Sequence, residues 1–210
     1  MLSAKVIVGL QDRETRSWHL NAGVDAGVGA AHAAESDRNQ AWLNLVARQH
    51  RANFDLWHIE DEARTLGATD AEIAAVKRRV DLTNQRRNDL AEELDRSLLA
   101  WLAARGLPNT AATLHSESPG LMIDRLSILA LKIWHTREEA ERESAPAGHA
   151  ERNLERLAIL SEQRADLAGC LDDLWHETLA GTRRFRLYRQ LKMYNDPSLN
   201  PAIYGHGGAR

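Results

Sequence analysis

The chain has 210 residues and a formal net charge of −3. This length allows one well-packed core, and the near-neutral charge excludes the strongly basic surface of a general nucleic-acid-binding protein. The single cysteine, Cys170, excludes an internal disulfide framework and is typical of a reducing cytoplasm. No apolar run is long enough to span a membrane, so we expect a soluble cytoplasmic protein that binds neither nucleic acid nor membranes.

The N-terminal residues 1–35 are rich in small residues, and we predict a flexible arm with a short strand at Lys5–Leu10. A first long helix then begins at Ser36 or Asp37, which are good N-terminal caps. Gly67 is suited to end this helix, because glycine adopts the left-handed conformation of a C-terminal cap without strain. A second helix follows, from residue 69 or 70 to about residue 105.

A third helix is predicted within residues 117–139, and it begins abruptly because Pro119 fits a first helical turn. Apolar residues on both of its sides indicate that it is buried nearly all round. A Pro-Gly break at residues 144–148 precedes a fourth helix over residues 151–180. Residues 36–182 are therefore predicted to form a helical bundle. Residues 183–210 form a basic C-terminal extension that we expect to lie over it as a strap.

The two halves of the bundle share a sequence pattern. Trp57-His58 recurs as Trp134-His135, a shift of 77 residues from 57 to 134, and the same shift aligns Arg87 with Arg164. A single ungapped shift that aligns both helices of each half indicates a duplicated helical hairpin. Two such hairpins predict an all-α fold, an antiparallel four-helix bundle.

One group of polar residues has the composition of a metal site. Two histidines are each followed three residues later by an acid, and each partner helix adds an aspartate, which gives the set His58, Asp61, Asp89, His135, Glu138 and Asp166. Such histidine–carboxylate sets bind two iron or manganese ions in helical bundles. The usual order is Glu-x-x-His, however, and here the histidine comes first. The alternative is that these groups form hydrogen bonds between helices or face water.

A second group is cationic. Arg87 and Arg164 lie mid-helix on predicted seams, and Asn84 lies one turn before Arg87. A buried guanidinium needs a carboxylate or an anionic ligand beside it. One alternative is a structural network in which Glu60 or Asp124 neutralises the arginines. The other is a pocket in which the arginines bind a phosphate or carboxylate.

The stretches NFDLWHIEDEAR, NQRRND, ESPGLMIDRLSIL and QLKMYNDPSLNP resemble a bacterial family of unknown function. The resemblance covers the chain from about Asn53 to Tyr204. It implies an autonomous helical domain without an assigned activity, associated with sugar-transfer or envelope-glycan pathways. The matching positions that it marks as candidates are Asn53, His58, Asp61, Arg64, Asn88, Asp89, Asp124, Arg125 and Lys192.

These observations together predict a helical-bundle enzyme or binding protein that acts on a small anionic metabolite, a phosphorylated sugar or nucleotide-sugar. The predicted acid–base residues are His58 with Asp61, His135 with Glu138, and Asp124. The predicted substrate-binding residues are Asn53, Arg64, Asn84, Arg87, Asn88, Arg125, Arg164 and Lys192. No cofactor is expected unless a divalent metal is bound, as in the alternative of a dinuclear oxidase. A non-catalytic scaffold that binds a partner protein, or forms a homodimer, is the third alternative.

Overall fold

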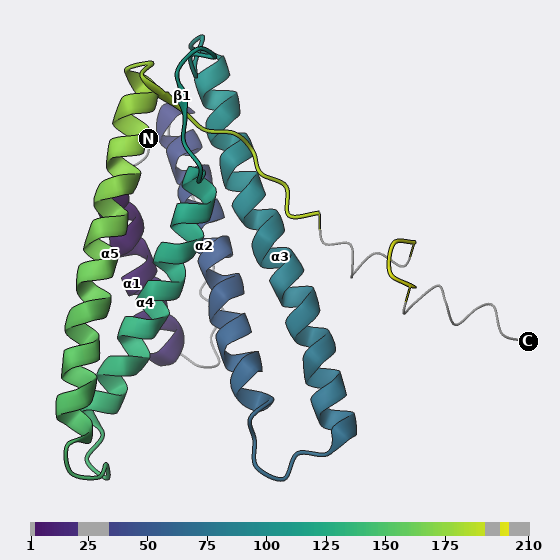
Figure 1. Ribbon diagram of the computed structural model, residues 1–210, viewed down its shortest axis with the longest axis vertical. Helices are drawn as coiled ribbons and strands as arrows, with labels where there is room; N and C mark the ends of the chain where they lie inside the picture. The colour runs from purple at the N-terminus through teal and green to yellow at the C-terminus, as the bar shows by residue number, and fades with distance from the viewer. Residues whose placement is uncertain (1–2, 21–33, 192–197, 202–210) are drawn as a thin grey trace, which may run out of the picture.

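The computed structural model describes residues 3–20, 34–191 and 198–201, and the prediction of an all-α fold is confirmed (Figure 1). The described helices are α1 (Ala4–Leu20), α2 (Ala34–Glu62), α3 (Asp70–Ala103), α4 (Pro119–Glu141) and α5 (His149–Leu179). Two short strands, β1 (Thr113–Leu114) and β2 (Arg183–Arg184), pair in parallel. None of the described helices is both long enough and apolar enough to cross a lipid bilayer.

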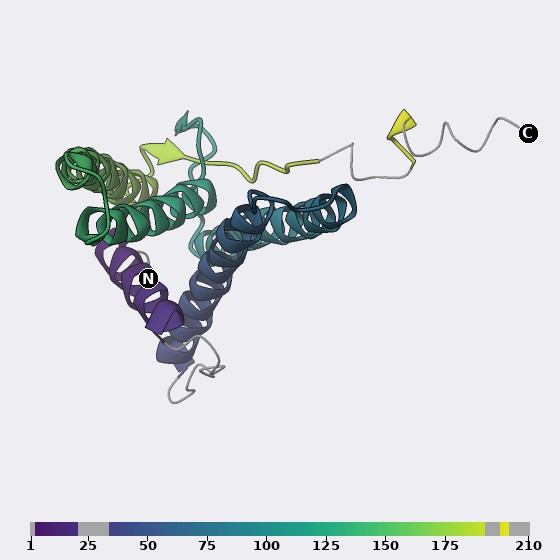
Figure 2. The same ribbon diagram turned by 90° about the horizontal axis from the view of Figure 1, so that it is seen from below.

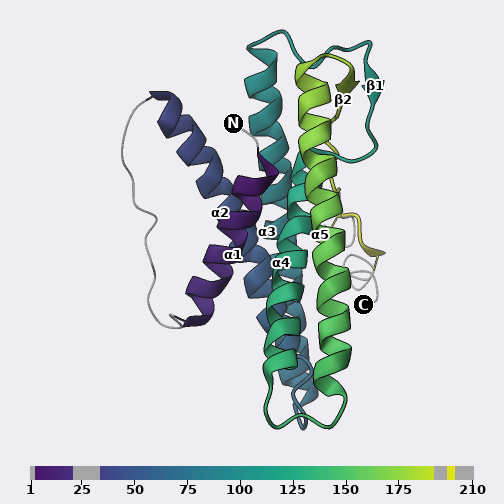
Figure 3. The ribbon, with the colours of Figure 1, turned by 90° about the vertical axis from the view of Figure 1, so that its left-hand side faces the viewer.

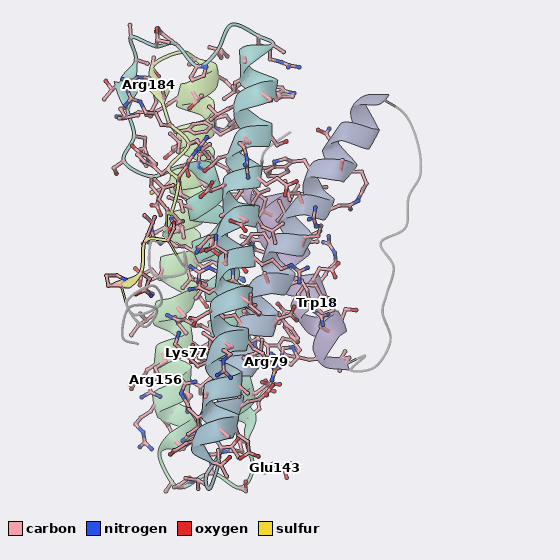
Figure 4. The ribbon with its side chains drawn as sticks, turned by 90° about the vertical axis from the view of Figure 1, so that its right-hand side faces the viewer. Trp18, Lys77, Arg79, Glu143, Arg156 and Arg184 are labelled. Atoms are coloured by element: carbon pink, nitrogen blue, oxygen red, sulfur yellow. The ribbon has the colours of Figure 1, made fainter. Side chains whose placement is uncertain are left out.

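Two helical hairpins, α2–α3 and α4–α5, make up most of the molecule (Figures 1 and 3). Gly67 has a φ angle of +83° in the turn between α2 and α3, which only glycine adopts without strain. Thr69 then caps α3 through a reciprocal pair of hydrogen bonds with Glu72. At the same end of this hairpin, Arg79 donates hydrogen bonds to both carboxylate oxygens of Glu62 (Figure 4).

Helix α4 is the central helix, since it contacts α1, α2, α3 and α5. Its first turn is fixed by Asp95 of α3, whose carboxylate accepts hydrogen bonds from the Ser118 hydroxyl and from the Gly120 amide, the latter at 2.7 Å. An acidic group at this position satisfies amides that have no partner within the helix. The prediction that α4 is buried on nearly all sides agrees with its fully buried Met122 and Leu131, which differ by nine positions.

The N-terminal segment differs from our expectation. Residues 4–20 form the helix α1 instead of an arm with a short strand, and α1 packs against α2, α4 and α5. Its buried residues Ala4, Ile7, Gln11 and Thr15 have helical spacing, but two of them are polar and conceal the apolar pattern. The rest of the predicted arm, from 21 to 33, lies outside the described residues.

Viewed from below, α1, α2 and α4 form three sides of a triangle (Figure 2). The described part of the chain therefore contains five helices where four were expected.

After α5, the chain is held against the end of the hairpins by β2 and the buried Phe185. The Gln190 amide donates a 2.9 Å hydrogen bond to Glu92 of α3. Of the predicted strap, 183–210, the structure describes only residues 183–191 and 198–201, so the strap stays a prediction.

Candidate functional site

A buried polar network joins α2, α3 and α4 around Asp124. One carboxylate oxygen of Asp124 accepts hydrogen bonds from the amides of Gln49 and Asn53, and the Arg87 Nε lies 3.3 Å from the same oxygen. Burial raises the pKa of the Asp124 carboxyl, and the Arg87 charge and the two amides act in the opposite direction. Asp124 thus stands beside Arg87 as a counter-charge, which is the arrangement that a structural network requires.

His50 continues this network towards α1. The Thr15 hydroxyl donates to the Gln11 carbonyl at 2.8 Å, so it accepts the hydrogen of His50 Nε2, also at 2.8 Å. His50 Nδ1 is then the acceptor for the Ser127 hydroxyl at 2.7 Å, and that hydroxyl in turn accepts from the Asn53 amide. Burial lowers the pKa of His50 to about 3, so the imidazole is neutral at physiological pH.

A cavity of about 340 Å³ adjoins the network between α2, α3 and α4. Its lining residues are Asn53, Leu56, Trp57, Glu60, Asp61, Arg64, Arg87, Ile128 and Leu131. Most of the wall is apolar, and Arg87 places a guanidinium on it. Among the residues that the structure describes, Asp124 is the ion-pair partner of the Arg87 guanidinium, and the buried Nε of Arg87 forms no hydrogen bond. Arg64, another lining residue, is exposed and lies 3.4 Å from Glu60.

The other predicted anion-binding residues do not converge on this cavity. Arg125 is exposed, forms an ion pair with Glu117 at 2.8 Å, and lines a separate groove between α4 and α5. Arg164 binds Asp12 of α1 at 2.6 Å. The expected convergence of Arg87, Arg125 and Arg164 on one anion therefore does not occur, because α1 and the loop before α4 supply separate carboxylates.

The predicted asparagines and lysine have different positions. Asn88 is buried beside Arg87 on α3, and its Nδ2 has no hydrogen-bond partner within the described ranges. Asn84 is half-buried on α3 but does not line the cavity. Lys192 lies outside the described residues.

Three histidines come together next to the cavity, and Trp57 both lines the cavity and stacks on one of them. They are His19 of α1, His58 of α2 and His135 of α4, and one ring nitrogen of each lies within 4.8 Å of those of the other two. Each Nδ1 donates to an oxygen: to Thr15 O at 2.7 Å, to Phe54 O at 2.9 Å and to Glu138 Oε2 at 2.8 Å, respectively.

Aromatic rings surround the histidine cluster. Trp57 stacks on His135 and Trp134 stacks on His19, each with ring centroids 4.8 Å apart. Phe54 contacts His58 at 4.3 Å. Trp18, labelled in Figure 4, contacts Phe54 where α1 meets α2. The cluster is therefore held on rigid helices by packed rings.

Three of the four carboxylates of the predicted dinuclear metal site, Asp61, Asp89 and Asp166, do not join these histidines. Asp61 is exposed and lines the cavity, and His58 donates to a backbone carbonyl instead. Asp89 is exposed and accepts a hydrogen bond from Gln85. Asp166 is exposed in the groove between α4 and α5. Within the described parts of the chain, the structure thus brings together two histidines and Glu138 of the predicted set.

We compared the sequence with models of known protein families. The model of a protein of unknown function, DUF4254, matches residues 43–187. The chain belongs to the DUF4254 family. This confirms the resemblance to a family of unknown function that the sequence motifs indicated. No curated protein and no solved structure matches the chain. The DUF4254 region contains every residue that lines the cavity, together with His58 and His135, whereas His19 precedes it.

Sequence reasoning missed His19, His50 and Ser127 of these clusters, as well as Thr15. His50 lies on the α2 seam, four residues after Val46 and three before Asn53, so helical spacing alone marks it as buried. Ser127 lies three residues after Asp124 on the same side of α4. His19 carries no such signal, because it falls in a segment that was not predicted to be helical.

Proposed function

We propose that this DUF4254 protein binds a small anionic metabolite in the cavity between α2, α3 and α4. The observation that supports the proposal is the Arg87 guanidinium, which lines the cavity with a side chain that is 24% exposed. Its Nε lies 3.3 Å from Asp124, and in this proposal its two terminal nitrogens bind a carboxylate or phosphate oxygen of the ligand. Asp124 and Asn53 then act as positioning residues that fix the guanidinium.

The cavity volume and its walls narrow the class of ligand. A cavity of about 340 Å³ is at the small end of the range for metabolite pockets, so it suits a sugar monophosphate better than a nucleotide-sugar. Trp57 offers a flat ring against which a sugar can pack. Of the acid–base residues predicted from the sequence, Asp61 lines the cavity, and His58 and His135 are not among its lining residues. Asp61 is therefore our candidate for acid–base catalysis in an enzymatic version of this proposal.

Replacing Arg87 by methionine is expected to abolish the thermal stabilisation of the protein by sugar monophosphates. At a ligand concentration about 100-fold above Kd, the wild-type protein should melt roughly 5–10 °C higher than without ligand. Differential scanning fluorimetry measures this shift relative to each variant's own melting temperature without ligand, which removes the direct effect of the substitution on stability.

The matched control is Arg86→Met, which removes the neighbouring and exposed arginine of α3 and should retain the full shift. The panel should contain hexose monophosphates, inorganic phosphate and short carboxylic acids, so that the anionic group and the sugar are tested separately. The proposal fails if no anion stabilises the wild-type protein, or if both arginine variants keep the shift.

We also propose that the α2–α3 and α4–α5 hairpins arose by duplication and together form an antiparallel four-helix unit to which α1 is added. The repeated Trp-His pairs support this, because Trp57 and Trp134 each stack on a histidine of the same cluster. Superposing the two hairpins with residues paired at the 77-residue shift tests it, and a poor fit in that register would count against duplication.

A further inference from the structure

We propose that His19, His58 and His135 form a binding site for one divalent transition-metal ion, with zinc as the first candidate. The three side chains come from α1, α2 and α4, and one ring nitrogen of each lies within 4.8 Å of the others. Two zinc ligands in a tetrahedral site are about 3.3 Å apart, so small side-chain rotations close the cluster around an ion. None of the three histidines lines the cavity, so this site does not depend on the function proposed for the cavity.

The protonation pattern of the cluster is that of metal-bound histidines. Carbonyl oxygens only accept hydrogen bonds, so the Nδ1 atoms of His19 and His58 must carry hydrogens, and the Glu138 carboxylate requires the same of His135. The Nε2 atom of each ring is therefore left with a free lone pair. Histidines that bind metals almost always donate their other nitrogen to a carboxylate or backbone carbonyl in this way.

Two of these nitrogens have no other explanation among the described contacts. Nε2 of His19 and Nε2 of His135 are buried, and neither has a hydrogen-bond partner in the described ranges of the chain. A buried nitrogen without a partner costs free energy, and this cluster contains two of them. A cation bound between the rings removes both penalties.

The electrostatic surroundings also favour a cation. Helices α1, α2 and α4 run in the same direction, so their carboxyl ends lie towards the same end of the molecule (Figure 3). His19 lies in the last turn of α1, and His58 is four residues from the end of α2. The partial negative charge of helix carboxyl ends attracts cations. Glu138 adds a full negative charge behind His135.

The ligand set defines the class of metal. Three neutral imidazoles suit zinc, copper, nickel or iron in preference to magnesium or calcium, which prefer oxygen ligands. Three protein ligands leave a coordination position for water, as in catalytic rather than structural zinc sites. The three histidines are half-buried as residues, although Nε2 of His19 and of His135 are themselves buried. Because His19 precedes the DUF4254 region, the N-terminal helix completes the site.

The test is a titration of metal-free protein with zinc, followed by calorimetry, and with cobalt, followed by its visible absorption. The wild-type protein should bind one equivalent of either ion. His19→Ala, His58→Ala and His135→Ala should each weaken binding by ~100-fold or more. Glu138→Gln, which removes the negative charge behind His135 but keeps a hydrogen-bond acceptor, should weaken binding by roughly 10-fold. The cobalt spectrum should have the intensity of four- or five-coordinate ions.

The matched control is His176→Ala, which removes an exposed histidine of α5 and should leave affinity and stoichiometry unchanged. Far-UV circular dichroism shows whether each variant is folded. If a histidine variant does not fold, the Glu138→Gln variant still tests the proposal. The proposal is overturned if folded wild-type protein binds no ion stoichiometrically, or if affinity falls equally in the His176 control. Arg87→Met should retain the metal, so failure of the cavity proposal leaves this one intact.

Discussion

Replacing Gly120 by alanine is expected to lower the free energy of unfolding by roughly 3 kcal/mol or more. A Cβ atom at this position would collide with the backbone oxygen of Ala91 and lie 2.9 Å from Cγ of Asp95. Both groups belong to α3, so the only relief is to move α4 away from α3. That movement would also break the hydrogen bond between Asp95 and the Gly120 amide, which fixes the first turn of α4.

The control for this experiment is Gly169→Ala on α5, where an added Cβ meets no atom within 4 Å. Alanine is favoured over glycine in a helix by up to about 1 kcal/mol, so this variant should be slightly more stable than the wild-type protein. Urea denaturation followed by circular dichroism measures both values. Equal stabilities for the two variants would show that α3 and α4 are not in close contact at Gly120.

The helices of residues 36–182 were predictable because local signals mark their ends. Gly67, Pro119 and the break before residue 149 each produce a boundary where the sequence indicated one. The α1 helix was not predictable from hydrophobic periodicity, since its seam uses Gln11 and Thr15. Those two side chains are buried only because His50 and the Ile123 carbonyl supply hydrogen-bond partners from other helices. Such long-range pairing is invisible in a local pattern.

The candidate sites, like the helices, were predictable where local spacing along the chain marks them. The spacing of residues within each helix identified Asn53, Arg87 and Asp124 as polar groups on buried faces. The structure brings these three residues, from three helices, together. The spacing did not reveal which helices supply the counter-charges, so Arg164 was expected beside Arg87 although it binds Asp12. The pairing of histidines across the repeat was visible in the sequence. The third histidine was not, because it belongs to α1.

The stability of the protein is expected to fall as His50 becomes protonated in the unfolded chain. The ordinary histidine pKa of 6.5 applies there, whereas burial lowers the pKa of His50 in the folded protein to about 3. Between these values the unfolded state binds more protons than the folded state, so stability is lost as the pH falls through this range. From pH 7.5 to pH 4 this loss amounts to roughly 3 kcal/mol.

Asp95 acts in the opposite direction, so the total pH dependence does not isolate His50. Burial raises the pKa of Asp95 from 3.8 to about 6, and between these values the folded state binds more protons and gains stability as the pH falls. The informative quantity is therefore the difference between the wild-type protein and His50→Gln, measured by urea denaturation at several pH values. The variant keeps Asp95, and it replaces His50 with a neutral side chain that still reaches Ser127 or Thr15.

The His50→Gln variant should lose about 3 kcal/mol less of its free energy of unfolding than the wild-type protein on acidification. Parallel curves would show that His50 is protonated in the folded protein at mildly acidic pH, and the hydrogen-bond directions derived for its network would then be wrong.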